Sequence, residues 1–303
     1  MRKVLIEAKN LSIGDTVASM PYIFKFQDVN PNDKIFVLIK KELVPYFKTI
    51  YNNVEYIDEN LNEIFDEIIH LKYDYNLTKS LQQGYAEQLG FINAPYIRPN
   101  ILIPNMERPI KNKYVAIGVH STSQLKYWNH PKGKRVQLEN PYWNELCGML
   151  RKEGYTPVVV EQNELFGQPP HMNGLPNKAN KKFGQSFLES MNLIYHAEFY
   201  IGLSSGMSWV AHAMGKPVAM IANFTEDWNE FDLSLTDYIR ITNKNVCHGC
   251  WNLINKEFKF DPYEDWYWCP RHKDTERQFE CHTSITPEMV FNEIKEWLPT
   301  INK

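Results

Sequence analysis

Several features of other protein classes are missing from this chain of 303 residues. It contains no run of about eighteen apolar residues, the length that a membrane-spanning helix requires. The formal net charge is −3, so no strong field of either sign favours nucleic acid or an anionic membrane as a partner. Residues 1–7 carry charge early and are typical of a first core strand, not of a secretory signal. We therefore expect a cytoplasmic protein with no transmembrane segment and no nucleic-acid partner.

Two motifs of nucleotide chemistry are also absent. No Gly-Lys-Ser/Thr closes a Walker A loop, and no Asp-x-Asp pair occurs anywhere in the chain. Metal-dependent sugar-nucleotide transferases usually hold Mg²⁺ or Mn²⁺ through such a carboxylate pair. Its absence favours an enzyme in which lysine and backbone amides stabilise the leaving group.

Cysteine is scarce, but four of the five cysteines lie in the last fifth of the chain. A Cys-x-x-Cys turn lets two thiolates reach one ion, and two further cysteines then complete a tetrahedral site. The four are Cys247, Cys250, Cys269 and Cys281. Because four thiolates leave no open position, the predicted metal is structural, either zinc or a rubredoxin-like iron. Unconnected buried thiols and disulfides are the alternatives.

Other residues near the four cysteines take secondary roles in this interpretation. Histidines 248, 272 and 282 are substitute ligands only if a thiolate is missing, so we expect them outside the ligand set or facing solvent. Cys147 lies in a helical segment far from the four and is expected to be plain core. Residues 243–284 form a long aromatic-rich segment, and a metal would offset the entropy of ordering it.

Strands and helices alternate along the chain, which predicts parallel βαβ units. We expect a first Rossmann-like domain at residues 1–112, in which 61–68 is a helix and 100–112 is a linker. The same pattern restarts over 113–303 and ends in an amphipathic helix at 287–298. Two doubly wound domains facing a cleft form the GT-B arrangement, an α/β fold whose ligands bind outside the carboxyl ends of the strands.

Asp15, after Gly14, follows the first predicted strand and its loop. A carboxylate at this edge suits a general base that takes a proton from a hydroxyl. The alternative is an acidic residue that only stabilises a helix N-terminus.

Two loops of the second half are candidates for binding phosphate. The first joins a strand to a helix, where small residues let backbone amides approach an anion; small residues also cap helices for local reasons. It contains Ser204, Ser205, Gly206, Met207 and Ser208. The second is a polar loop whose hydroxyls and one lysine suit a diphosphate, although an ordinary solvated loop has the same composition. It contains Ser121, Thr122, Ser123 and Lys126.

Together these segments resemble the bacterial heptosyltransferases of glycosyltransferase family 9, most closely the branch that modifies autotransporter proteins. The likeness is carried by segments 11–21, 120–129 and 202–217 and by the four cysteines. Ser204-Ser205-Gly206 stands where many relatives have Asp-Thr-Gly. The resemblance implies ADP-heptose as donor, Asp15 as base and iron in the four-cysteine site.

These observations predict an inverting GT-B glycosyltransferase without a catalytic metal. Its first domain would bind the acceptor, a protein Ser/Thr hydroxyl or a glycan, and its second the nucleotide sugar. A nucleotide-sugar epimerase or hydrolase of the same fold is one alternative. A metal-ribbon protein that binds nucleic acid is another. Assembly into a homo-oligomer stays open.

Overall fold

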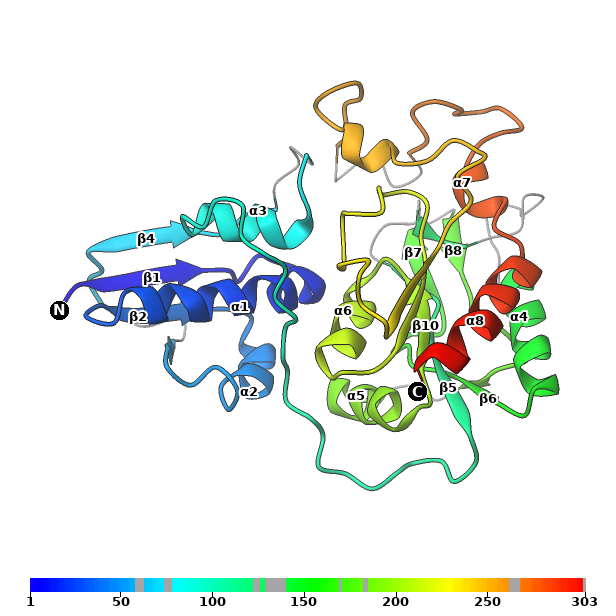
Figure 1. The fold of residues 1–303 in the computed structure, drawn as a ribbon, viewed down its shortest axis with the longest axis horizontal. Helices are drawn as coiled ribbons and strands as arrows, with labels where there is room; N and C mark the ends of the chain where they lie inside the picture. The colour runs from blue at the N-terminus through cyan, green and yellow to red at the C-terminus, as the bar shows by residue number, and fades with distance from the viewer. Residues whose placement is uncertain are drawn as a thin grey trace.

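The computed structural model describes residues 1–57, 63–73, 78–121, 126–128, 140–168, 171–181, 185–261 and 268–301. Two parallel sheets, each accompanied by helices, lie one after the other along the longest axis of the molecule (Figure 1). Strands alternate with helices in both halves. The α/β class predicted from the sequence is therefore confirmed.

The sheet of the N-terminal half has four parallel strands in the order β3-β2-β1-β4. Its strands are β1 (Lys3–Glu7), β2 (Lys34–Leu38), β3 (Glu55–Tyr56) and β4 (Glu67–His70). Helices and 3₁₀ turns of this half are α1 (Ile13–Val29), η1 (Lys41–Leu43), α2 (Val44–Phe47) and α3 (Leu81–Gln88). Pro21 lies inside α1, and the helix continues through it.

The sheet of the C-terminal half has six parallel strands in the order β12-β11-β10-β5-β6-β9. They are β5 (Tyr114–Gly118), β6 (Thr156–Val159), β9 (Asn180–Lys181), β10 (Tyr200–Leu203), β11 (Val218–Ile221) and β12 (Tyr238–Ile241). A separate antiparallel hairpin pairs β7 (Phe166–Gln168) with β8 (His171–Asn173).

The helices of this half are α4 (Pro141–Lys152), α5 (Phe187–His196), α6 (Gly206–Ala213), η3 (Cys250–Leu253), α7 (Glu280–Thr283) and α8 (Pro287–Ile301). The terminal helix α8 packs against α4, as its amphipathic pattern predicted, and is three residues longer than expected. In the part of the chain that the structure describes, no helix is both long and apolar enough to span a membrane.

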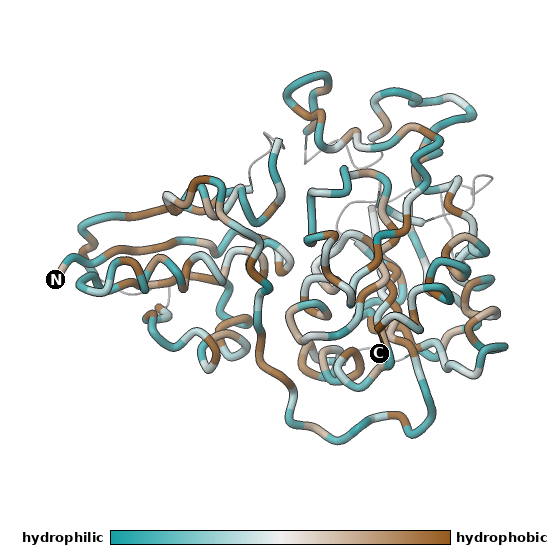
Figure 2. The backbone as a smooth tube through the Cα atoms, viewed as in Figure 1, coloured by the Kyte–Doolittle hydropathy of each residue, from teal (hydrophilic) through white to brown (hydrophobic). Residues whose placement is uncertain are grey.

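The central strands of the C-terminal sheet are buried on both faces. Every residue of β5, β10 and β11 is buried, as expected where helices cover a parallel sheet. The tube in Figure 2 shows these strands as largely hydrophobic chain. One continuous cluster of buried side chains includes Val4 and Ile6 of β1 as well as Trp209 and Val210 of α6. The two halves therefore share apolar packing.

One local prediction was wrong. The helix expected at 61–68 does not form over its described residues, because 63–66 are irregular and Glu67 already begins β4. Ile64 is 89% exposed, so the apolar residues there do not share one buried helical face. The connection between β6 and α5 contains β7, β8 and β9, because pairing with neighbouring strands outweighs its weak local pattern.

Candidate functional site

The amino ends of α1 and α6 meet where the two halves touch. A Cβ added to Gly14 would lie 3.0 Å from Cα of Gly206, and one added to Gly206 would lie 2.3 Å from Cγ2 of Ile13. Only glycine allows the two backbones to approach so closely. The amino end of a helix presents free N–H groups and positive partial charge. The contact thus combines two such ends beside the carboxyl edges of both sheets.

Asp15 lies in the first turn of α1, and Ser12 is the N-cap residue of that helix. Ser12 Oγ accepts a hydrogen bond from the Asp15 backbone N–H at 3.4 Å and donates one to Asp15 Oδ2 at 2.6 Å. The capping hydroxyl therefore belongs to Ser12, which leaves the Asp15 carboxylate available for another role.

Burial raises the pKa of Asp15 above its ordinary value, although Ser12 and the charge of Lys126 act in the opposite direction. A raised pKa makes a carboxylate a better proton acceptor. The dipole of α1 lowers the pKa of an acid in its first turn, and burial offsets that effect.

The small residues of the loop between β10 and α6 lie between a strand and a helix, as predicted from the sequence. Ser204 follows β10, Ser205 is the N-cap of α6 and Gly206 is its first residue. Met207 is half-buried in the first turn of the helix. Ser208 Oγ donates to the Leu203 carbonyl at 2.6 Å, so this hydroxyl joins the helix to the strand.

The structure brings Lys126 to this loop from a distant part of the chain. Its Nζ donates to the Ser204 carbonyl at 3.1 Å and to Ser204 Oγ at 3.4 Å, and lies 5.8 Å from the centre of the Trp251 ring. Ser121 is buried just beyond β5, whereas Thr122 and Ser123 lie outside the described residues.

Sequence reasoning missed a buried ion pair behind Ser204. Glu230 accepts hydrogen bonds from Ser204 Oγ and from Arg240 Nη1, and Thr225 Oγ1 lies 3.0 and 3.1 Å from its two oxygens. The side chain of Arg240 is 2% exposed and that of Glu230 is 3% exposed. No local pattern marks this pair, because β12 and the 225–230 loop meet only after the sheet forms.

The charged side chains of this cluster shift one another's pKa values. Burial lowers the pKa of Lys126, while Glu230 and Asp15 raise it and Arg240 lowers it further; the outcome is a pKa below the ordinary value. Burial raises the pKa of Glu230, but Arg240, Lys126 and Ser204 outweigh it and leave the pKa below its usual range. The cluster thus pairs an ionised buried carboxylate with two cations.

One pair of the four cysteines, Cys247 and Cys250, has the spacing of a tetrahedral thiolate site. Cys247 Sγ and Cys250 Sγ lie 3.7 Å apart, close to the edge of about 3.8 Å that a tetrahedron with metal–sulfur bonds of about 2.3 Å requires. All four are free thiols, so the disulfide alternative is not observed. Burial raises the pKa of Cys269, and the backbone N–H groups of Phe279 and His272 act against that shift.

A second set of donors, Cys247, His272 and Glu280, also lies within 4.8 Å. Arg277 already holds the Glu280 carboxylate through hydrogen bonds of 2.8 and 2.6 Å, and Glu280 also accepts from the Cys247 N–H at 3.1 Å. Glu280 is therefore occupied in supporting the loop. His282 is buried and its Nδ1 lies 3.3 Å from Cys281 Sγ, so of the two positions expected for it, it lies beside a predicted ligand and does not face solvent.

The cysteine segment also reaches the N-terminal half. Trp251, next to Cys250, donates from its indole N–H to Tyr73 Oη at 2.6 Å. Figure 1 shows this segment, in orange, at the end of the C-terminal half beyond β7 and β8. The cysteine segment therefore lies beside Lys126, whose Nζ is 5.8 Å from the centre of the Trp251 ring.

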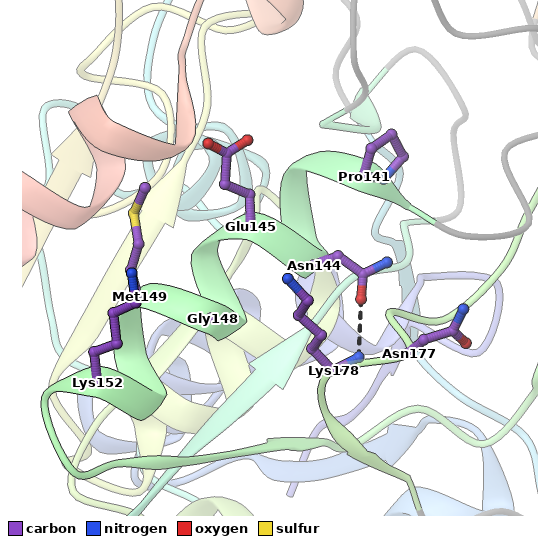
Figure 3. A pocket seen from close by; sticks show the side chains of 8 residues that line it. All are labelled: Pro141, Asn144, Glu145, Gly148, Met149, Lys152, Asn177 and Lys178. Carbon is purple, nitrogen blue, oxygen red and sulfur yellow. Dashed lines mark hydrogen bonds between the residues drawn. The ribbon is translucent and has the colours of Figure 1, made fainter.

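A separate surface hollow of about 660 Å³ lies along α4. Its lining includes Asn144, Gly148 and Lys178, and Asn144 Oδ1 accepts from the Lys178 N–H at 2.8 Å (Figure 3). None of the predicted site residues lines it.

Comparison with known proteins gives a consistent result. No family model matches the chain. The autotransporter heptosyltransferase Aah of Escherichia coli is 30% identical over 310 residues, covering 97% of this chain and 74% of that protein. The chain belongs to the autotransporter heptosyltransferase family. A relative from Citrobacter rodentium, BAHTCr, is 37% identical over 212 residues, which cover 69% of this chain and about half, 48%, of the relative.

The crystal structure of TibC from enterotoxigenic E. coli, described as an iron-containing dodecameric glycosyltransferase, aligns with a TM-score of 0.86. Identity is 26%, and the alignment covers 99% of this chain and 77% of TibC. A second TibC structure is a complex with ADP-D-beta-D-heptose. These matches confirm the family resemblance and the GT-B fold. The chain is a glycosyltransferase, and no match supports the nucleic-acid-binding alternative.

Proposed function

We propose that this chain transfers heptose from ADP-heptose to a hydroxyl of an autotransporter protein, with inversion at the anomeric carbon. The observation that carries the proposal is the contact of Gly14 in α1 with Gly206 in α6, which brings Asp15 to the loop where Lys126 donates to Ser204. Support comes from TibC, which binds ADP-D-beta-D-heptose, and from relatives named for autotransporter substrates.

Asp15 is the proposed base. Its carboxylate takes the proton of the acceptor hydroxyl as the oxygen forms a bond to the anomeric carbon. The bond from that carbon to the diphosphate oxygen breaks on the opposite face, and its electron pair leaves with ADP. In this account residues 1–112 form the acceptor domain, and residues 113–303 form the donor domain.

Lys126 and the amino end of α6 act on the leaving group. Negative charge grows on the diphosphate as it departs, and a buried ammonium stabilises it more strongly than an exposed one would. The free N–H groups near Ser205, Gly206 and Met207 add favourable interactions with phosphate oxygens. Ser121, Thr122, Ser123, Ser204 and Ser208 complete the proposed donor loops.

We propose that Cys247, Cys250, Cys269 and Cys281 hold one iron ion, with zinc as the alternative. The metal would supply structural cross-linking of the segment, with no open position for substrate. Iron is favoured because the TibC crystal structure contains it. Thiols that must stay reduced to bind metal suit the cytoplasm, where we place the enzyme. The dodecameric relative suggests a homo-oligomer.

Mass spectrometry of products tests this function. The purified protein is incubated with ADP-heptose and an autotransporter passenger domain, with ADP-glucose as a matched donor control. The proposal predicts ADP release and a heptose mass increment on the acceptor, with little transfer from ADP-glucose. ADP release that is equally fast without acceptor would indicate a hydrolase. An isomerised nucleotide sugar would indicate an epimerase.

A further inference from the structure

Ser204 connects two buried charges. Its Oγ accepts from Lys126 Nζ at 3.4 Å and donates its single proton to Glu230 Oε1. The direction of both hydrogen bonds is therefore fixed: ammonium to hydroxyl, and hydroxyl to carboxylate. Because the two hydrogen bonds run in the same direction, each polarises the other and becomes stronger.

Glu230 has no freedom to move away from Ser204. Arg240 Nη1 holds its second oxygen, and Arg240 Nη2 donates to the Thr225 carbonyl and Thr225 Oγ1 at 2.7 Å each. The guanidinium thus joins β12 to the 225–230 loop and aims the carboxylate at the end of β10. A buried carboxylate with this many partners is rigid as well as ionised.

The cluster contains charged groups of both signs. Lys126 and Arg240 are the buried cations, and Glu230 is the buried anion between them. Asp15 acts on Lys126 from α1, Asp227 lies 3.5 Å from Arg240 Nε but also pairs with Lys244, and burial keeps His282 neutral. Arg240 pairs directly with Glu230, whereas Lys126 reaches the carboxylate only through Ser204 Oγ.

We propose that Glu230 is a positioning residue for transfer: through Ser204 Oγ it fixes the ammonium of Lys126 at the donor loop and keeps it protonated. The inference deepens the proposed function, because it assumes that Lys126 faces the diphosphate. A purely structural Glu230 would join β12 to the 225–230 loop without affecting how Lys126 titrates.

The test is the dissociation constant of ADP as a function of pH, measured by calorimetry on the full chain. Loss of the carboxylate in Glu230→Gln removes the charge that raises the pKa of Lys126. ADP affinity falls at alkaline pH as Lys126 loses its proton, and we call this part of the pH profile the alkaline limb. In Glu230→Gln the alkaline limb should lie about one pH unit lower than in the wild type. Between the two limbs the variant should bind ADP about tenfold more weakly. Ser204→Ala keeps the Glu230–Arg240 pair and should displace the limb in the same direction by a smaller amount.

A double variant that moves the carboxylate from position 230 to position 204 tests the same idea in the opposite direction. In Ser204→Asp/Glu230→Gln a carboxylate at position 204 meets Lys126 Nζ directly, so the alkaline limb should return toward its wild-type position. The matched controls are Glu198→Gln, which removes a carboxylate paired with Arg108, and Ser190→Ala, which removes a buried hydroxyl bonded to Val160. Both should leave the limb unchanged.

An unchanged limb in both Ser204→Ala and Glu230→Gln, with Lys126→Ala weakening ADP binding, would overturn this inference and leave the proposed function standing. ADP binding and transfer unaffected in Lys126→Ala would overturn both. A limb displaced equally by Glu198→Gln would also overturn it, because the effect would then follow net charge and not the Ser204 link.

Discussion

Gly14 and Gly206 face each other at the contact between the two halves, each at the amino end of a helix. A Cβ on Gly14 would stand 3.0 Å from Cα of Gly206 and 3.2 Å from Cδ1 of Trp209. The pair therefore sets how closely α1 and α6 approach. Because Asp15 and Ser205 are their neighbours, the same contact sets the spacing of the proposed base and the donor loop.

Gly206→Ala should reduce transfer more than it reduces stability. The new methyl group would meet Ile13 Cγ2 at 2.3 Å, so one helix must move. Overpacking of this kind costs about 1–3 kcal/mol, and a displacement of about 1 Å between reacting groups lowers the rate about 100-fold. Gly148→Ala in α4 is the control, since its nearest neighbour would be Lys178 Nζ at 3.6 Å and transfer should persist. Wild-type turnover in Gly206→Ala would show that this spacing does not matter.

Lys126→Ala should lower kcat together with donor affinity. The lost interaction grows as the diphosphate leaves, and removing one such stabilising group typically lowers the rate about 10²–10³-fold. Lys216→Ala is a matched control, because Lys216 is also a partly buried lysine that donates to a backbone carbonyl, that of Ala197 at 2.6 Å. Steady-state kinetics should show transfer retained in the control. Equal kinetics for the two variants would remove Lys126 from the mechanism.

Cys250→Ser should release metal and lower thermal stability. Metal binding and ordering of residues 243–284 are coupled, so loss of one thiolate destabilises the whole segment. We expect elemental analysis of the wild type to give one iron per chain, and the variant to lose most of it with a Tm lower by about 5 °C or more. Cys147→Ala, in the core of α4, should keep the metal. Wild type free of stoichiometric metal would contradict the site.

His120 and Glu161 should give opposing pH dependences of stability. The backbone N–H of His120 donates to Glu161 Oε1 at 2.8 Å; burial raises the pKa of Glu161 to about 7 and lowers that of the His120 imidazole to about 4. The raised pKa means that stability contributed by Glu161 is complete below about 4.5 and is lost as pH rises through about 7. The lowered pKa means that stability contributed by His120 is present above about 6.5 and is lost as pH falls through about 4.

Single substitutions should separate the two contributions to the free energy of unfolding, each of about 3 kcal/mol over its pH range. In Glu161→Gln, denaturant unfolding should show stability rising from pH 4 to pH 6.5. His120→Gln should instead lose stability between pH 4.5 and pH 7. Parallel pH profiles in the two variants and the wild type would show that neither group titrates as proposed.

The sequence predicted well what periodicity and spacing control. The strands and helices that carry Asp15 and the 204–208 loop lie where alternating apolar segments placed them, because parallel strands end at a common edge. The Cys-x-x-Cys turn likewise depends only on local spacing. The order of strands and helices along the chain was enough to predict that these residues lie near the carboxyl ends of the strands.

What the sequence did not reveal depends on contacts between distant segments. Glu230 and Arg240 look like ordinary charged residues until β12 joins the sheet and buries them behind Ser204. The same holds for Trp251, whose contact with Tyr73 joins the cysteine segment to the N-terminal half. The helix expected at 61–68 failed because edge-strand pairing at Glu67 outweighed local helical preference.

The central claim is that Asp15 removes the acceptor proton, and Asp15→Asn tests it most directly. The amide keeps the size of the side chain, and the N-cap hydroxyl of Ser12 stays in place, so Tm should change by no more than about 2 °C. ADP affinity should stay within about twofold, because the nucleotide contacts belong to the donor loops. Heptose transfer should fall by about 10²–10⁴-fold, the usual effect of losing a positioned base. Transfer at the wild-type rate in a folded, ADP-binding Asp15→Asn protein would contradict the mechanism.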